Sequence, residues 1–296
     1  MPKVIENIEL APRAHRLRVE VPRLVQKALA GQFVIVRADE NGERVPMSIG
    51  GLDRERGLLT MVIQEVGKTS AQLCDTPAGA ELADVVGPLG EPTEIKNFGH
   101  AVVVGGGIGI APIYPVAQAL RAAGNRVTAI IGARNKSLLF YREELGSASD
   151  RLMVTTDDGS EGLKGFVSTA LQQLIETDKP DWIMAIGPVP MMRSVANLTR
   201  QHAIPTVVSL NPIMIDGTGM CGGCRVSVGG HTRFACVDGP DFDAHQVDFD
   251  ELVQRQAQYK PFEKDAYERY LEHREECSLE LAIQKAHHSE KTTSCR

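Results

Sequence analysis

The sequence predicts a small β-barrel followed by a parallel α/β sheet, with a cysteine-bearing module and a helical tail after them. Three observations support this prediction. Short apolar strands occur over residues 1–97, strands alternate with helices over 98–210, and a glycine-rich segment with three cysteines occupies 211–246. The remaining residues, 247–296, are charged and helical in spacing. Such changes in the pattern of strands and helices along the chain indicate separate domains, because each domain packs its own set of strands or helices around one core.

The composition is that of a globular protein and excludes several classes. The 296 residues are 43% hydrophobic and carry a net charge of −6, which argues against nucleic acid as a partner. We expect no membrane span, because no run of about 18 apolar residues exists, and the N-terminus lacks a signal-peptide core. Six cysteines in such a chain predict a cytoplasmic protein whose thiols bind a cofactor.

The first domain is predicted from three strand-like segments. Arg16–Val21 alternates polar and apolar side chains with period 2, and Gln32–Val36 and Leu58–Ile63 are apolar or β-branched runs bounded by turn residues. Several short strands at this spacing favour a small barrel or sandwich. Gly87-Pro88-Leu89-Gly90 is expected to form a turn.

Two segments beside these strands have the chemistry of a flavin site. Arg44-Val45-Pro46-Met47-Ser48-Ile49 joins two predicted strands, and a serine there can hydrogen-bond a flavin ring. The loop with Gln64, Val66, Gly67, Lys68 and Thr69 precedes a helix and offers N–H groups, hydroxyls and a cation to a pyrophosphate. Each segment alone also fits an ordinary structure, since Thr69 or Ser70 can simply cap the helix.

The second domain is predicted from alternating strands and helices. Ala101–Val104 is an apolar run typical of a buried parallel strand, and a helical pattern follows over 112–123. Val127–Ile131, Leu152–Thr156 and Trp182–Ile186 are further strands with helices between them. This alternation indicates a parallel α/β sheet.

Glycines and polar residues follow four of these strands, where ligands gather in open α/β sheets. The candidate nucleotide-binding residues are Gly106, Gly107, Ile108, Gly109, Ala111 and Pro112 after the first strand, Gly132, Ala133 and Arg134 after the second, Asp157 and Asp158 after the third, and Gly187, Pro188 and Met191 after the fourth. The strict G-x-G-x-x-G fingerprint is absent because Ile stands at position 110. Each of these segments could be an ordinary turn between a strand and a helix. Four such segments at one edge of the sheet nevertheless favour a ligand-binding site.

Asp216, Cys221, Cys224 and Cys236 follow the spacing D-x4-C-x2-C-x11-C. Plant-type [2Fe–2S] ferredoxins use C-x4-C-x2-C with a distant fourth cysteine, so Asp216 takes the place of their first ligand. Thiolates suit iron, and the glycines around them let the backbone wrap a cluster. A zinc knuckle is the main rival, and Cys74, Cys277 or Cys295 could replace Asp216 as the fourth ligand. Apart from this possibility, Cys74, Cys277 and Cys295 belong to no recognisable motif.

The C-terminal segment is predicted to be helical over 249–258 and 262–286, with a frayed polar end at 287–296. Its charges fit either a clamp on a partner protein or a solvated helix.

In these motifs the chain resembles the ferredoxin–NADP reductase superfamily over about residues 3–270. Within it, the chain is similar to the branch of dihydroorotate dehydrogenase electron-transfer subunits, and most of all to small subunits of NADH-dependent ferredoxin:NADP oxidoreductases, also described as sulfide dehydrogenase subunits. The matches are Pro46–Ile49, Gly87–Gly90, Gly105–Pro112, Asp157–Ser160 with Lys164 and Gly165, and Asp216–Cys224 with Cys236–Pro240. One departure is Val45, which stands where the superfamily often has an arginine; Arg44 is shifted by one residue.

The resemblance implies an FAD-binding barrel over 1–97, an NAD-binding α/β domain over 98–210, a [2Fe–2S] module over 211–246 and a tail over 247–296. It also implies hydride transfer from NADH to flavin, with Ser48 tuning the flavin N5 or serving only as a structural serine. In the resembled subfamily an aspartate and three cysteines hold the cluster, as Asp216 would here; the dihydroorotate branch has four cysteines.

The implied partner is a larger iron–sulfur flavoprotein subunit that binds NADP, with ferredoxin reached indirectly and electron bifurcation as the activity. Other partners remain open: a dihydroorotate dehydrogenase, a sulfide dehydrogenase, a sulfite reductase or a hydrogenase. A non-enzymatic zinc-bearing interaction module is the rival from another class.

Overall fold

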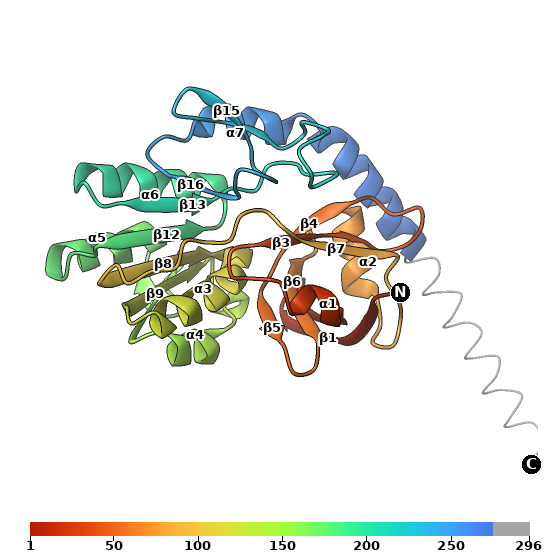
Figure 1. Cartoon of the computed structure of the whole chain (residues 1–296), viewed down its shortest axis with the longest axis horizontal. Coiled ribbons are helices and arrows are strands. Elements are labelled where there is room, and N and C mark those ends of the chain that lie inside the picture. Colours follow the sequence, from red (N-terminus) through yellow and green to blue (C-terminus); the bar gives the residue numbers. More distant parts are fainter. Residues whose placement is uncertain (275–296) are drawn as a thin grey trace, which may run out of the picture.

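A computed structural model describes residues 1–274 of the chain, which fold into a barrel-like lobe and an α/β lobe (Figure 1). Two antiparallel sheets build the first lobe. One has the order β1 (Lys3–Ala11), β2 (Ala14–Glu20), β6 (Leu58–Gln64), β5 (Gly51–Asp53), and the other has the order β4 (Val45–Ser48), β3 (Phe33–Arg37), β7 (Asp84–Leu89). The short helices α1 (Pro22–Val25) and α2 (Lys68–Asp75) complete it.

Period-2 patterning explains these strands. In β2, Leu17 and Val19 are fully buried while Arg16, Arg18 and Glu20 point outward. β6 is buried along most of its length, because Leu59, Met61 and Ile63 face the barrel core while Val62 packs against the α/β lobe. The three predicted strands are thus confirmed.

Three edge segments differ from the prediction. Arg44–Ile49, expected to be a connection, contains β4, and Gly87–Leu89, expected to be a turn, lies at the end of β7 with a cis Gly87–Pro88 peptide. β1 was not predicted at all. β4 is an edge strand, so Pro46 leaves no ladder hydrogen bond unmade, although proline in a sequence argues against a strand.

The α/β lobe is a seven-stranded sheet in the order β11, β10, β9, β8, β12, β13, β16, in which only β16 is antiparallel to its neighbour. Its strands are β8 (His100–Gly106), β9 (Arg126–Ala133), β10 (Arg151–Thr156), β11 (Leu163–Lys164), β12 (Trp182–Ile186), β13 (Thr206–Ser209) and β16 (Asp241–Asp243). The helices are α3 (Ile110–Ala122), α4 (Arg142–Ala148), α5 (Val167–Thr177) and α6 (Val189–Gln201), with the 3₁₀ turns η1 (Gly107–Gly109) and η2 (Lys136–Leu138).

Both faces of this sheet are covered, which explains its apolar strands. In β8, Ala101 and Val103 pack with α3 on one face, whereas Val102 and Val104 pack with α5 and α6 on the other. The chain leaves β8 for β9, β10 and β11 on one side and then returns to β12 on the other. This reversal makes a switch point at the carboxyl ends of β8 and β12, where such sheets bind ligands.

The cysteine-bearing segment does not form a core of its own. It contributes the hairpin β14 (Arg225–Val228) and β15 (His231–Phe234), while β16 joins the large sheet by pairing with β13. Cys224, Cys236 and residues of α7 (Phe249–Ala257) lie in the same hydrophobic cluster as α5 and α6. The boundaries predicted at 210 and 246 therefore fall within one continuous core.

The tail is helical as predicted over α7 and again over residues 260–274, where its second helix runs down beside α2 (Figure 1). The rest of the predicted helix to 286, the polar end at 287–296, Cys277 and Cys295 lie outside the described residues. Within residues 1–274, no helix is both long and apolar enough to cross a membrane.

Candidate functional site

A cavity of about 1220 Å³ lies between the two lobes and the tail. Its size exceeds that of an ordinary small-molecule pocket, typically about 300–1,000 Å³, as expected for a site that holds more than one nucleotide. Most of the residues predicted to bind nucleotides line it: Pro46, Met47, Ser48, Gln64, Val66, Gly67, Lys68, Thr69, Gly106, Gly107, Ile108, Gly109, Ala111, Pro112, Gly132, Ala133, Arg134, Asp157, Gly187, Pro188 and Met191.

Two predicted residues do not line the cavity. Ile49 is 1% exposed and packs in the barrel core, because its neighbour Ser48 takes the opposite face of the chain. Asp158 is exposed, and its carboxylate accepts hydrogen bonds from the backbone N–H and hydroxyl of Ser160 at 2.9 and 2.6 Å. Its carboxylate therefore holds a turn. Arg44 is also outside the lining, whereas its neighbours Glu43 and Val45 belong to it.

The barrel side of the cavity combines Ser48 with the N-terminus of α2. Ser48 is exposed at the end of β4, so its hydroxyl is not part of the barrel core. Ser70 Oγ accepts the N–H groups of Val66 and Gly67 at 3.0 and 2.9 Å, so the capped helix start weighed from the sequence is present. The same turn lines the cavity, and the hydrogen bonds to Ser70 fix its shape.

Glu43 is a residue of this side that the sequence did not single out. Its carboxylate accepts the Thr69 hydroxyl at 3.2 Å and lies 3.9 Å from Lys68 Nζ. Before a phosphate binds, the lysine charge is therefore partly neutralised by Glu43.

The α/β side brings the four predicted turns together. The register pairs Gly105 with Ile186, Gly106 with Gly132, and Thr156 with Ala133, so the strand ends form one row. The glycines in this row have close neighbours. A Cβ at Gly109 would lie 2.1 Å from the carbonyl oxygen of Ile186, and one at Gly106 would lie 2.2 Å from Met191 Sδ. Glycine is required at position 109 because backbone atoms already occupy the space, whereas a larger residue at position 106 would make the Met191 side chain move.

Several cavity residues escaped the sequence analysis because they come from segments with no nucleotide motif. They are Phe166 before α5, Ser209, Leu210, Asn211 and Met214 at the entrance of the cysteine-bearing segment, Pro240 at its exit, and Phe262, Glu263 and Ala266 of the tail. Only the three-dimensional fold brings them to one place.

The four predicted cluster ligands form two pairs. Cys224 and Cys236 are buried with their sulfurs 3.1 Å apart, and Asp216 Oδ2 accepts the N–H of the exposed Cys221 at 2.7 Å. A [2Fe–2S] cluster has two irons and takes four protein ligands, and these four residues supply that number of donors. Within residues 1–274 no group of three or more His, Cys, Asp or Glu side chains is gathered to hold a single metal ion.

The chemistry of these donors also fits. Hydrogen bonds from the N–H groups of Thr218 and Cys221 lower the pKa of Asp216, so it is an ionised donor at neutral pH. Burial and the neighbouring Cys224 raise the pKa of Cys236 to about 12, while the Gly219 N–H opposes that rise by pointing at the sulfur. Iron would displace this thiol proton, as metals do at cysteine sites.

The cysteine-bearing loop rests directly on the barrel-like lobe. Gly217 has φ +75°, and a Cβ there would lie 2.6 Å from Leu89 Cδ1 of β7 and 3.2 Å from Ile35 Cγ1 of β3. Met214 and Pro240, which flank the loop, line the cavity. The candidate cluster and the cavity therefore share a wall.

Comparisons with known proteins agree with this geometry. A family model described as the iron–sulfur cluster binding domain of dihydroorotate dehydrogenase B matches residues 211–248, and an oxidoreductase NAD-binding domain matches 103–197. A dihydroorotate dehydrogenase B electron transfer subunit homologue of Thermotoga maritima is 46% identical over 91% of this chain and 95% of its own length. The chain belongs to this family of electron transfer subunits. A probable electron transfer subunit of Methanopyrus kandleri is 35% identical over 88% of this chain and 96% of its own.

Among solved structures, an NADH-dependent reduced ferredoxin–NADP oxidoreductase, studied for flavin-based electron bifurcation, matches with a TM-score of 0.88 and 44% identity, over 92% of this chain and 98% of that chain. Phthalate dioxygenase reductase, at 19% identity and a TM-score of 0.55 over 77% of this chain and 85% of that chain, shares the fold. This electron transfer subunit is thus an oxidoreductase that uses FAD, a [2Fe–2S] cluster and NAD(H), and it works with a partner subunit.

Proposed function

We propose that this subunit passes electrons between NADH and a [2Fe–2S] cluster through FAD within a bifurcating NADH-dependent ferredoxin:NADP oxidoreductase. One observation carries the proposal: a single cavity joins the barrel to the strand ends of the α/β lobe, and the cysteine-bearing loop forms its neighbouring wall. Bound FAD would supply the conversion between electron pairs and single electrons.

The chain's own residues would bind and orient. Ser48 would donate to the flavin ring, and the N–H groups at the start of α2 would hold its pyrophosphate. The Gly106–Gly109 turn would seat the nicotinamide dinucleotide, with Arg134 and Asp157 beside its far end. Asp216, Cys221, Cys224 and Cys236 would hold the cluster. Hydride transfer needs no general acid or base, which agrees with the lack of a catalytic histidine among the cavity residues.

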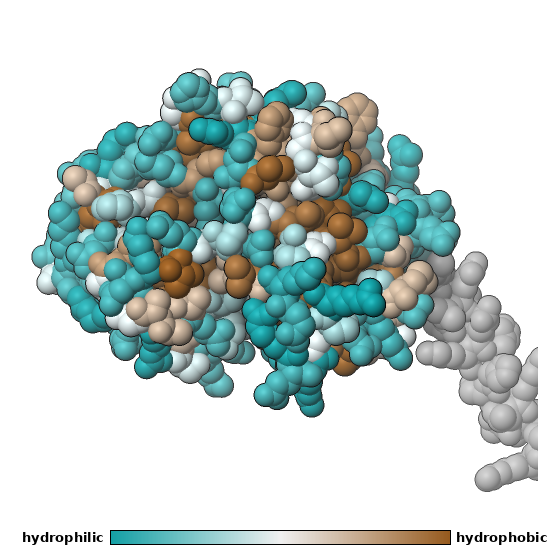
Figure 2. All heavy atoms as spheres, in the orientation of Figure 1, coloured by the Kyte–Doolittle hydropathy of each residue, from teal (hydrophilic) through white to brown (hydrophobic). Residues whose placement is uncertain are grey.

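The partner would dock where the cluster comes nearest to the surface. Ile215, Met220 and Val237 of the cysteine-bearing segment are 52, 87 and 44% exposed, and Val86 of β7 is 42% exposed. Figure 2 shows apolar side chains gathered on this face over β4 and β7 and toward the cysteine-bearing loop. An apolar surface of this kind is typical of a protein interface. We expect the partner to be a larger, NADP-binding iron–sulfur flavoprotein; a cytoplasmic location also stays a prediction.

A second candidate is the electron transfer subunit of a dihydroorotate dehydrogenase, because relatives of that description match at 30–36% identity. Asp216 favours the first candidate, since four cysteines are expected in the second.

Affinity purification of the tagged chain from its own cells separates the two. We expect a larger subunit that carries flavin and iron to copurify, and the complex to reduce ferredoxin and NAD⁺ together from NADPH. Copurification of a dihydroorotate-oxidising subunit, with no NADPH-dependent activity, would contradict the first proposal and support the second.

A further inference from the structure

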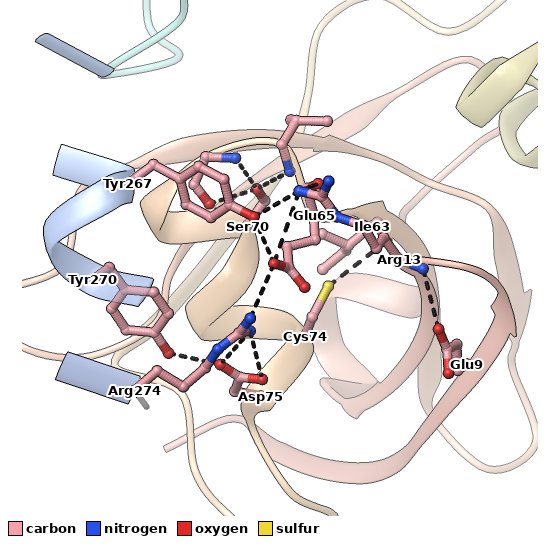
Figure 3. Close-up of polar contacts among 12 residues, drawn as sticks. Glu9, Arg13, Ile63, Glu65, Ser70, Cys74, Asp75, Tyr267, Tyr270 and Arg274 are labelled. Atoms are coloured by element: carbon pink, nitrogen blue, oxygen red, sulfur yellow. Dashed lines mark hydrogen bonds and ion pairs between the residues drawn. The ribbon is translucent and has the colours of Figure 1, made fainter. Parts of the chain in front are cut away.

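The second helix of the tail, residues 260–274, grips the barrel through a polar network (Figure 3). The Tyr267 hydroxyl donates to Glu65 Oε1 at 2.6 Å and accepts from Arg13 Nη2 at 2.6 Å. The Tyr270 hydroxyl donates to Asp75 at 2.8 Å, and Arg274 bridges Asp75 and Glu65 at 3.2 and 3.5 Å. The tail is therefore fixed to the flavin lobe over more than 190 residues of intervening sequence.

This network holds α2 at both ends. Glu65 stands just before the turn that opens α2 at Lys68, and Asp75 is the last residue of α2. The Glu65 side chain is only 11% exposed. Burial raises its pKa, but hydrogen bonds and charges from Tyr267 and Arg274 outweigh burial and lower it. A charged Glu65 and a fixed α2 keep the proposed pyrophosphate turn in position.

A neighbouring face of the same helix lines the cavity. Ala266 lies one turn after Phe262 and Glu263, and all three belong to the cavity lining, as do Val66 and Gly67 of the proposed pyrophosphate turn. Phe262 and Val66 are 72 and 70% exposed although both are apolar. Exposed apolar side chains at a cavity mark a surface that a flat, apolar ligand group can cover.

We propose that the tail helix binds the adenosine half of the flavin and makes the site select FAD over FMN. The inference rests on the proposed function, which places the flavin pyrophosphate at the start of α2. FMN ends at its phosphate, so only the adenosine of FAD extends beyond that turn. Phe262 offers its ring to the adenine, and Glu263 offers a carboxylate to the ribose or the adenine amino group.

Binding of FAD and FMN to the flavin-free full chain, followed by quenching of flavin fluorescence, tests this inference. Phe262→Ala is expected to raise the Kd for FAD by about fivefold to a hundredfold, the range for loss of one base–aromatic stack. The Kd for FMN should stay within about twofold of the unchanged chain. Tyr259→Ala is the matched control, because Tyr259 is 47% exposed in the same tail but does not line the cavity.

A second variant tests the grip separately. Tyr267→Phe with Tyr270→Phe removes two hydroxyls without emptying space. It should speed FAD release more than FMN release, because FMN loses only support of the phosphate turn whereas FAD also loses the position of the tail helix.

If Phe262→Ala raised the Kd for FAD and for FMN equally, or changed neither Kd, the inference would be overturned and the electron-transfer proposal would stand. A full chain that binds neither flavin would overturn both.

Discussion

Asp216 keeps its carboxylate inside its own loop, where the N–H groups of Thr218 and Cys221 donate to its two oxygens at 2.9 and 2.7 Å. A carboxylate is a harder donor than a thiolate, and it gives iron less electron density. An exchange of this aspartate for a cysteine is therefore expected to change the reduction potential of the cluster.

Replacing this ligand tests its role. We expect Asp216→Cys to keep a [2Fe–2S] cluster and to shift its reduction potential, because the ligand changes from a hard carboxylate to a soft thiolate. A spectroelectrochemical titration with EPR measures the change. Asp243→Cys, at an exposed aspartate of β16, is the control and should change neither the reduction potential nor the EPR signal. If Asp216→Cys also left both unchanged, Asp216 would be excluded as a ligand.

Asp241 is a second unusual carboxylate, placed where the barrel meets β16. Its Oδ2 accepts the Thr93 hydroxyl at 2.6 Å, while its Oδ1 is out of solvent and has no hydrogen-bond partner within the described residues. Burial raises the pKa of Asp241 to about 6, and the hydrogen bond from Thr93 opposes that rise.

This raised pKa predicts a pH dependence of folding. The folded chain holds the proton more tightly than the unfolded chain, so this contribution to stability is complete below about pH 4 and is lost as the pH rises to about 6. Because each unit of pKa shift corresponds to about 1.4 kcal/mol, protonated Asp241 contributes up to about 3 kcal/mol to the free energy of unfolding. Urea unfolding at pH 4.5 and 7 should show that Asp241→Asn loses this slope relative to the unchanged chain. The exposed control Asp243→Asn should keep it, and an Asp241→Asn slope equal to that of the control would contradict the prediction.

At the scale of the elements, Gly109 closes η1 against the end of β12. Gly109→Ala places a Cβ 2.1 Å from the Ile186 carbonyl oxygen, so the turn must shift. We expect a loss of about 1–3 kcal/mol of stability, as for other overpacked sites, and a weaker affinity for NADH.

Gly146→Ala is the matched change in α4, where an added Cβ meets nothing within 4 Å. It should stabilise the chain by about 0.5–1 kcal/mol, because alanine favours helix over glycine. Thermal unfolding and NADH titration of the Gly109→Ala and Gly146→Ala chains measure these effects. Equal changes in stability and in NADH affinity for the two substitutions would contradict the predicted clash at Gly109.

Sequence patterns predicted elements well where burial alone determines them. The strands of the α/β lobe are buried on both faces, so their apolar runs indicate them directly. The edge strands β1 and β4 were missed because one side of each is unpaired, and residues such as Pro46 are tolerated there. The turn before α2 could be predicted to line the cavity because Gly67, Lys68 and Thr69 stand next to one another in the sequence.

At the scale of the whole molecule, the cavity and the cluster loop depend on contacts that no local pattern contains. Gly217 lies on Leu89 of the barrel, and the tail reaches Arg13 over 254 positions. The sequence predicted that the tail either contacts a partner protein or is a solvated helix, because its charged residues are compatible with both. Only the packed structure places Phe262 at the cavity, whereas the D-x4-C-x2-C-x11-C spacing predicted the candidate cluster ligands from a short segment.

The most direct test of one electron path is an anaerobic visible spectrum of the purified chain during titration with NADH. Flavin and iron–sulfur absorption should bleach together, because the cavity joins the nicotinamide side to the barrel and the cluster loop shares its wall. A chain that contains flavin and iron but whose cluster bands stay unchanged while the flavin bleaches would contradict this account.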